Sequence, residues 1–333
     1  MPRQGPAARF PLAVPVFRRV EDLPISVSAT SRSAAGPSWL TPNVRGVLWM
    51  ITAGLCLTGM FSVGKYLAES LPVLEVSLFR MAAALLFYIP WLMRHGLSRA
   101  RTSRIGGHFV RAFFGATSLL CMMYGVAYLP LSDATVLGFT IPLWNIILSS
   151  IFLGERVRLR RTIATVVGFV GVVIVVQPQG GIQPAALLTI FGAMLASCAL
   201  ITMKDLTRTE PSDRIVFYFL IFGSLILAGP AIPVWQTPTL EQWGWIALLG
   251  LFGSSGQLFL TRGYAAGEVT IVAPMDFLRV IVAGLIGFTI FSEIPDWPTY
   301  VGSAIVVAAC VYIVRREAIL KKAPKAPEAA AGS

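Results

Sequence analysis

Long apolar stretches follow one another along most of the chain, separated by short polar or Pro/Gly connectors. About 20 apolar helical residues cross the roughly 30 Å hydrocarbon core of a bilayer. Ten stretches come close to this length: 44–64, 73–93, 107–127, 132–153, 162–178, 184–203, 214–235, 243–262, 269–291 and 297–314. The pattern predicts an all-α integral membrane protein with ten transmembrane helices.

The two ends of the chain differ from this pattern. Residues 1–43 carry scattered prolines, arginines and serines, and residues 317–333 carry lysines and an Ala-rich stretch. Such segments bury too little apolar surface to fold alone. We predict a disordered basic tail at each end.

Composition and charge narrow the function classes. Hydrophobic residues make up 56% of the chain and charged residues 13%, about half the usual share. This excludes water-soluble enzymes and nucleic-acid binders. The net charge of +11 has another origin, because all but four of the 27 Lys and Arg residues lie in tails and connectors on one side of the predicted spans. Basic connectors stay in the cytoplasm, so both termini are predicted to be cytoplasmic, and no nucleic-acid partner is expected.

An internal repeat divides the chain into two halves. An offset of 138 residues relates Phe114-Gly115 to Phe252-Gly253 and Glu155 to Glu293. Because five spans is an odd number, a second copy must run upside down relative to the first. Inverted repeats of this kind enclose mid-bilayer sites in secondary transporters. We therefore predict two inverted five-helix repeats, over 44–178 and 184–316.

Short motifs recur in a fixed order along these spans. They are Tyr128-Leu-Pro-Leu-Ser-Asp-Ala-Thr135, Phe139-Thr-Ile-Pro142, Phe152-Leu-Gly-Glu155, Val272-Ala-Pro-Met-Asp-Phe277 and Phe291-Ser-Glu293. With them the chain resembles the drug/metabolite transporter superfamily, in particular its EamA-type ten-span carriers, over residues 44–316. The second half is most similar to the branch that contains S-adenosylmethionine uptake carriers.

The resemblance implies a central cavity lined by spans 1–4 and 6–9, with spans 5 and 10 peripheral. It also implies a secondary transporter that moves a small polar organic metabolite, of amino-acid or nucleotide-derived type, across the cell membrane by alternating access. Two alternatives stay open: a non-transporting membrane scaffold or regulator, and an intramembrane enzyme. The sequence shows no catalytic constellation, so we expect no enzyme.

Charged residues inside spans are costly and mark candidate sites. Arg80 and Arg279 are predicted to anchor a carboxylate or phosphate, and Asp276 to bind an amine or a coupling proton. Alternatively, Asp276 and Arg279 form a neutralising pair at i, i+3, and Arg80 makes a structural contact to backbone carbonyls or to Asp276 across the bundle. Arg111, near the inner end of span 3, is expected to reach back to the cytoplasmic surface.

Uncharged residues add weaker candidates. Pro142 and Pro274 each free a backbone carbonyl inside a span, which indicates either a helix break at the cavity or a simple kink. Trp144, Asn145, Tyr124 and Gln257 are further candidate substrate-binding residues, although each is also compatible with helix packing.

Other ligand classes lack support in the sequence. The four cysteines are scattered through apolar runs, and the two histidines lie in or beside a basic connector. We expect no metal and no cofactor. The series Gly250-x-x-Gly253-x-x-Gly256 lies inside an apolar span, where small residues let helices approach closely. A homodimer and proton coupling both stay open.

Overall fold

Helices fill the part of the chain that the computed structural model describes, residues 41–95, 101–153, 159–176, 183–266 and 273–322. Their bounds are α1 Pro42–Ala68, α2 Val73–His95, α3 Ile105–Tyr128, α4 Leu131–Gly138, α5 Ile141–Leu153, α6 Leu159–Val176, α7 Pro184–Leu206, α8 Ser212–Ala231, η3 Ile232–Val234, α9 Leu240–Ala266, η4 Ala273–Phe277, α11 Leu278–Phe291 and α12 Trp297–Lys322. The predicted all-helical fold is confirmed. Residues 1–40, 323–333 and Glu155 lie outside the described residues.

Helix ends extend beyond two predicted boundaries. Helix α1 begins at Pro42, where the hydroxyl of Thr41 accepts a hydrogen bond from the Val44 N–H at 3.3 Å. This cap satisfies one of the free N–H groups of the first turn. Helix α12 continues to Lys322, because residues 317–322 contain no helix breaker and the next proline is Pro324. Hydropathy alone marks the edge of the apolar stretch and misses both extensions.

Most predicted spans correspond to helices of membrane-crossing length. Six spans in the described residues are long and apolar enough to cross a bilayer. They are α1, α3, the α4–α5 pair, α7, α8 with η3, and α9. Helices α6 and α12 contain shorter apolar stretches, and α2 and the η4–α11 pair complete the ten spans.

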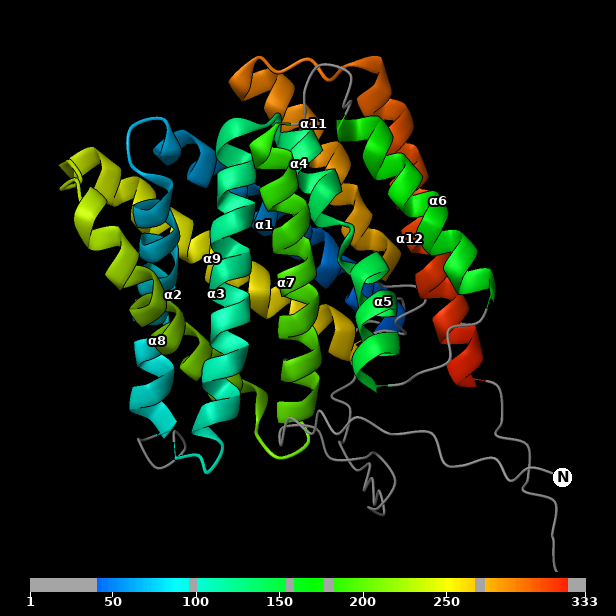
Figure 1. Cartoon of the computed structure of the whole chain (residues 1–333). Coiled ribbons are helices and arrows are strands. Elements are labelled where there is room, and N and C mark those ends of the chain that lie inside the picture. Colours follow the sequence, from blue (N-terminus) through cyan, green and yellow to red (C-terminus); the bar gives the residue numbers. More distant parts are fainter. Residues whose placement is uncertain (1–40, 96–100, 154–158, 177–182, 267–272, 323–333) are drawn as a thin grey trace, which may run out of the picture. The chain divides into compact units, whose positions relative to one another are not determined.

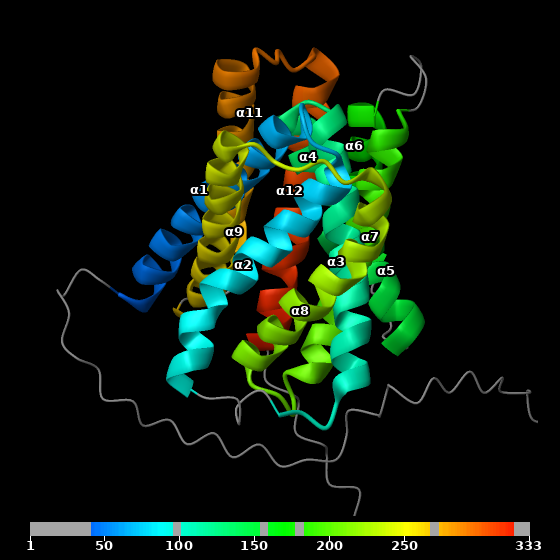
Figure 2. The same ribbon diagram turned by 90° about the vertical axis from the view of Figure 1, so that its left-hand side faces the viewer.

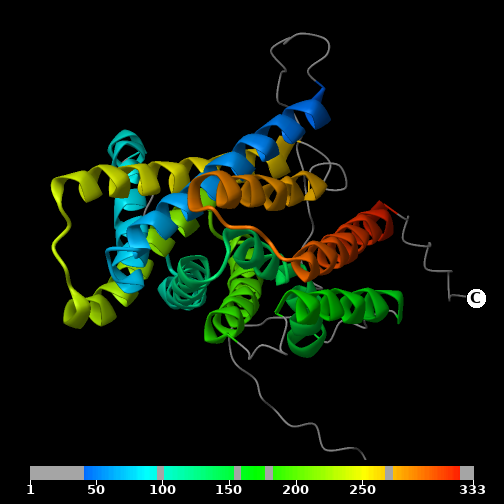
Figure 3. The same ribbon diagram turned by 90° about the horizontal axis from the view of Figure 1, so that it is seen from above.

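Helix packing follows the predicted repeat. In the repeat, α1 corresponds to α7 and α9 corresponds to α3. Helix α1 packs on α9 (Figure 2), and in the same way α7 packs on α3. Helices α2 and α8 are counterparts that pack on each other, as are α6 and α12, which lie side by side in Figures 1 and 3. These four pairings are therefore unchanged when the two halves are exchanged. This is the arrangement that a pseudo-twofold axis between inverted repeats produces.

Glycines allow the closest of these approaches. A Cβ atom on Gly171 of α6 would lie 2.9 Å from the backbone oxygen of Gly302 in α12, and one on Gly302 would lie 2.7 Å from the oxygen of Gly171. In α9, a Cβ on Gly250 would collide with Ala83 of α2. These three glycines serve helix packing, as the sequence predicts for small residues inside apolar spans.

Candidate functional site

Two spans are interrupted where the repeats meet. Span 4 breaks between α4 and α5 at Phe139 and Thr140, and span 9 is a 3-10 turn, η4, before it becomes α11. Phe139 and Phe277 are related by the same offset of 138 residues, and their ring centroids are 4.8 Å apart. The Cys310 thiol lies 3.2 Å from the freed Phe139 carbonyl and donates to it. The two interruptions therefore face each other across the repeat interface.

The predicted prolines lie beside these interruptions. Pro142 is the second residue of α5, in the first turn, where its missing N–H removes no helical hydrogen bond. Pro274 is the second residue of η4. In span 4 the helix breaks before Pro142, and the described part of span 9 begins with the 3-10 turn that contains Pro274. A role of either proline at a cavity stays a prediction.

Asp276 and Arg279 form an ion pair at the second interruption. The NH1 atom of Arg279 lies 3.4 Å and 3.5 Å from the two Asp276 carboxylate oxygens. The guanidinium carbon lies 5.5 Å from the centroid of the Phe139 ring and 6.0 Å from that of Phe61. Both charged side chains are largely buried, at 15% exposed for Arg279 and 19% for Asp276. Among the described residues, the buried Nε of Arg279 has no hydrogen-bond partner.

A small pocket lies beside this pair, between α1 and the η4–α11 region. Its volume is about 150 Å³. It is lined by Ile51, Gly54, Leu55, Met275, Leu278, Arg279, Ile281 and Val282. Arg279 supplies its charge, and the other lining residues are apolar or small. Gly54 leaves the room that Arg279 needs, because a Cβ there would lie 3.0 Å from the Arg279 Cγ.

Arg80 lies apart from the Asp276–Arg279 pair. It is 7% exposed, and its guanidinium is 3.5 Å from the Met60 sulfur and 3.4 Å from the Met81 sulfur. Thioethers are weak acceptors. Neither alternative contact predicted for Arg80, to a backbone carbonyl or to Asp276, is present among these bonds.

The uncharged candidates occupy different environments. Trp144 packs edge-on against Phe169 of α6, with ring centroids 5.2 Å apart, and its buried indole N–H has no partner in the described residues. Asn145 accepts a 2.5 Å hydrogen bond from Ser197 of α7. Tyr124 lies against Tyr128, and Gln257 is exposed on α9. The structure does not bring these four residues to the Asp276–Arg279 pair, and their binding roles stay predictions.

Arg111 departs from its expected orientation. Its guanidinium does not reach back toward the start of α3 but lies over Gly115, one turn further along the helix, with its carbon 4.0 Å from the centroid of the Phe219 ring of α8. A Cβ at position 115 would collide with the NH1 of Arg111. The missing side chain of Gly115 and the facing ring of Phe219 hold the cation inside the bundle.

One ion-pair cluster, missed by the sequence, joins the ends of α1, α3 and α11; we name it the Lys65 clasp. Lys65 pairs with Glu293 and donates to the Leu129 carbonyl at 2.6 Å. The other Glu293 oxygen accepts the Leu131 N–H at 2.8 Å. Ser292 adopts the left-handed conformation, and the Glu293 N–H bonds to the Gly287 carbonyl, a motif that ends α11. The sequence feature that could have indicated this cluster is Lys65, the one Lys or Arg in the connectors predicted on the side opposite the termini.

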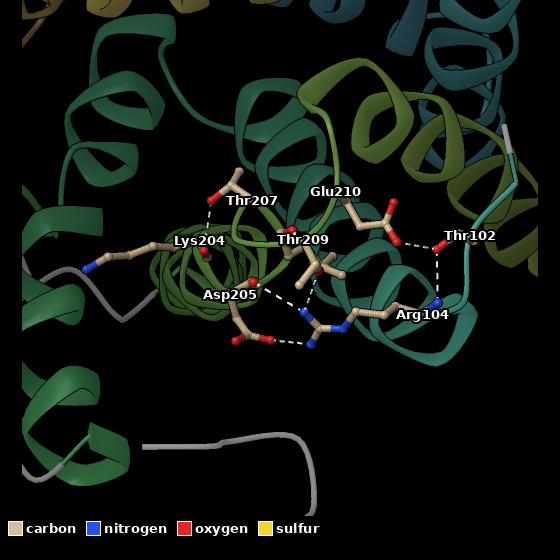
Figure 4. A network of polar contacts seen from close by, with 8 residues as sticks. Thr102, Arg104, Lys204, Asp205, Thr207, Thr209 and Glu210 are labelled. Carbon is tan, nitrogen blue, oxygen red and sulfur yellow. Dashed lines mark hydrogen bonds and ion pairs between the residues drawn. The ribbon is translucent and has the colours of Figure 1, made fainter. Parts of the chain in front are cut away.

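A second cluster, the Arg104 clasp, joins the start of α3 to the α7–α8 connection (Figure 4). Arg104 pairs with Asp205 at 2.5 Å and donates to the Thr209 hydroxyl at 3.1 Å. Thr102 donates to Glu210 at 2.6 Å. Arg214 pairs with the same carboxylate. Burial alone would raise the pKa of Glu210, but the hydrogen bonds from Thr102 and Arg214 outweigh it and lower that pKa.

The two clasps lie at opposite ends of the helices. Helix α3 begins beside the Arg104 clasp and reaches the Lys65 clasp at its far end. Within the described ranges, no three His, Cys, Asp or Glu side chains come together as metal ligands would.

Comparison with known proteins accounts for this arrangement. The model of the EamA-like transporter family matches the chain twice, over residues 44–177 and 183–315. The chain is 31% identical to the S-adenosylmethionine uptake transporter of Rickettsia bellii, over 82% of this chain and 94% of that protein. It is 32% identical to the riboflavin transporter of Rhizobium johnstonii, over 84% and 94%. It is 30% identical to the pseudopaline exporter CntI of Pseudomonas aeruginosa, over 81% and 96%.

A solved crystal structure shares the fold, with a TM-score of 0.57 at 15% identity, over 83% of this chain and 99% of that one. The named relatives are transporters of small metabolites and not enzymes. The double family match coincides with the two halves related by the helix packing. The protein is therefore a multi-pass membrane protein of the EamA-like transporter family.

Proposed function

We propose that the protein is a secondary carrier that moves a small polar organic metabolite, of amino-acid or nucleotide-derived type, across the cell membrane by alternating access. The observation that carries this proposal is the Asp276–Arg279 pair at the meeting point of the two interrupted spans. The distance between the two charged groups is long for an ion pair, 3.4 Å, and the Arg279 guanidinium lies near the rings of Phe61 and Phe139. Arg279 also lines a pocket. Arg279 binds an anionic group of the metabolite, and Asp276 binds its amine or a coupling proton.

The two clasps fit the same cycle. A carrier of this kind opens to one side of the membrane at a time. Opening at one end breaks the Lys65 clasp, and opening at the other breaks the Arg104 clasp. The distribution of basic connectors supports an orientation in which the Arg104 clasp and both termini lie in the cytoplasm.

The first experiment identifies a substrate. Purified protein is screened by thermal shift against amino acids, nucleotides, S-adenosylmethionine and riboflavin, the last two being named for its relatives. A ligand at 100 times its Kd stabilises the folded protein by about 2.7 kcal/mol. A panel in which no metabolite raises the Tm and none is taken up by proteoliposomes would contradict the proposal.

The second experiment tests the pair in proteoliposomes with the metabolite so identified. Asp276→Asn keeps the shape of the side chain and removes its charge, so we expect transport to be lost or uncoupled while the protein still inserts and folds. Arg279→Ala should weaken binding of anionic substrates most, by about tenfold or more. The matched control is Asp296→Asn, at an exposed position. Unchanged kinetics in Asp276→Asn would remove that residue from the mechanism.

A further inference from the structure

Two arginines of the interior, the buried Arg80 and the half-buried Arg111, have no acidic partner among the described residues. Arg80 of α2 is bonded there only to two methionine sulfurs. Arg111 of α3 stacks on the Phe219 ring, and its Nε and NH1 are buried without hydrogen-bond partners. One glycine of α8 touches the surroundings of both: a Cβ on Gly223 would lie 3.3 Å from the Met81 sulfur that Arg80 contacts, and 3.6 Å from Ala116, the neighbour of the Gly115 over which Arg111 lies. The two guanidinium groups therefore lie in the same region between α2, α3 and α8.

The other cations that are at least half-buried in the described chain are neutralised. Lys65 pairs with Glu293, Arg104 with Asp205, Arg214 with Glu210 and Arg279 with Asp276. An ion buried without a counter-charge costs several kcal/mol. Two such ions of like sign in one region therefore favour the binding of an added anion, because no acidic side chain in the described ranges pairs with either of them.

The backbone is shaped to admit both guanidinium groups. Gly115 lies under Arg111, where a Cβ would collide with NH1 and lie 2.7 Å from the Phe219 ring. Gly253 of α9 lies beside Arg80, where a Cβ would be 3.3 Å from Nε. These are the two glycines of the Phe-Gly pairs that the 138-residue offset relates. The same position in each repeat thus makes room for one of the two arginines.

We propose that Arg80 and Arg111 together bind a doubly charged oxyanion group of the substrate, either a phosphate or a pair of carboxylates. Each guanidinium presents N–H groups in a planar fork that matches such oxygens. This inference rests on the proposed carrier function and narrows it to metabolites with a dianionic end. Arg279 and Asp276 remain available for a second, amine-bearing or singly charged part of the same molecule.

Binding of simple anions to the purified full-length protein tests the proposal. The probes are inorganic phosphate, succinate and acetate, at constant ionic strength, and the readouts are thermal shift and calorimetry. We expect phosphate or succinate to raise the Tm and acetate to have far less effect. Which of the two dianions binds more tightly decides between a phosphate and a dicarboxylate substrate.

Three variants locate the site. Arg111→Gln and Arg80→Gln should each weaken dianion binding about tenfold or more. Gly115→Ala retains both charges but displaces Arg111, so it should weaken binding as well and serves where a charge variant fails to fold. The matched control is Arg262→Gln, because Arg262 also stacks on an aromatic ring, Trp49, but is exposed. The Arg262→Gln variant should bind the dianion with the same affinity as the unmodified protein.

The outcomes separate this proposal from the carrier function. Metabolite transport without any dianion-dependent Tm shift would overturn the two-arginine site and leave the carrier intact. Dianion binding that is equal in all variants would also overturn it. Dianion binding that depends on both arginines, in a protein that transports nothing, would support the site and count against the carrier.

Discussion

Arg279 is held by shape more than by its ion pair. Its separation from Asp276, 3.4 Å at the shortest, is long for a charge-assisted hydrogen bond. The side chain instead rests in the notch left by Gly54 and against two aromatic rings. A guanidinium positioned in this way keeps N–H groups free for a ligand while its stem stays fixed.

Gly54→Ala should therefore reduce function without reducing stability. The new Cβ would lie 3.0 Å from the Arg279 Cγ and push that side chain out of its notch. Alanine is a better helix former by about 1 kcal/mol, which offsets the crowding. We expect substrate affinity to fall about tenfold and the Tm to change by only a few degrees. Thermal shift and transport in the same preparation measure both.

The control for Gly54→Ala is Gly284→Ala in α11, where nothing lies within 4 Å of the added Cβ. It should leave affinity unchanged. Equal affinity in the two variants would show that the notch does not position Arg279.

For single residues, the sequence predicts which charged side chains lie inside the membrane spans but not the direction in which each side chain extends. The i, i+3 spacing of Asp276 and Arg279 already predicts their contact. The direction of Arg111 depends on Gly115 in its own helix and on Phe219, far along the chain. No local pattern encodes that combination, and the expectation that Arg111 would reach the surface was wrong for this reason.

The interruptions of spans 4 and 9 follow the repeat more closely than the prolines do. Pro142 is the third residue after Phe139, whereas Pro274 is the third before Phe277. The prolines are therefore out of register, but both interruptions occur at the repeat-related phenylalanines. The prolines in the sequence indicate which two spans are irregular. They do not indicate that the irregular points are Phe139 and Phe277, because a phenylalanine in an apolar run looks like any other apolar residue.

Helices α6 and α12 depend on glycine for their contact, which gives a prediction about stability. Gly302→Leu places a side chain where even a Cβ would lie 2.7 Å from the backbone oxygen of Gly171. The backbone cannot yield as a flexible side chain can, so the helices must separate. We expect a loss of about 1–3 kcal/mol, seen as a lower Tm of the purified protein.

Gly284→Leu is the control for helix packing, because its site is open. Substrate affinity of the folded Gly302→Leu protein should be nearly unchanged, since the family resemblance makes these two helices peripheral. A Tm equal to that of the control would contradict the role of the glycine contact.

For the whole molecule, the odd number of spans in each half predicts the inverted arrangement without any structure. The pairing of counterpart helices agrees with it, and the double family match gives the same two halves. The clasps were not predictable, because each joins residues more than 100 positions apart, such as Arg104 with Asp205. Their pairing is fixed by how the helices pack, which no local periodicity specifies.

The unneutralised charges of Arg80 and Arg111 also affect the step in which the empty carrier returns to its starting conformation. Without cargo, the return step leaves two unneutralised cations inside the helix bundle, where an ion without a counter-charge costs several kcal/mol. A loaded return avoids this penalty, so the protein should swap one solute for another faster than it resets empty. We expect isotope efflux from vesicles to accelerate several-fold when unlabelled solute is supplied outside. Identical efflux with and without that solute would show that the vacant carrier bears its charges at no cost.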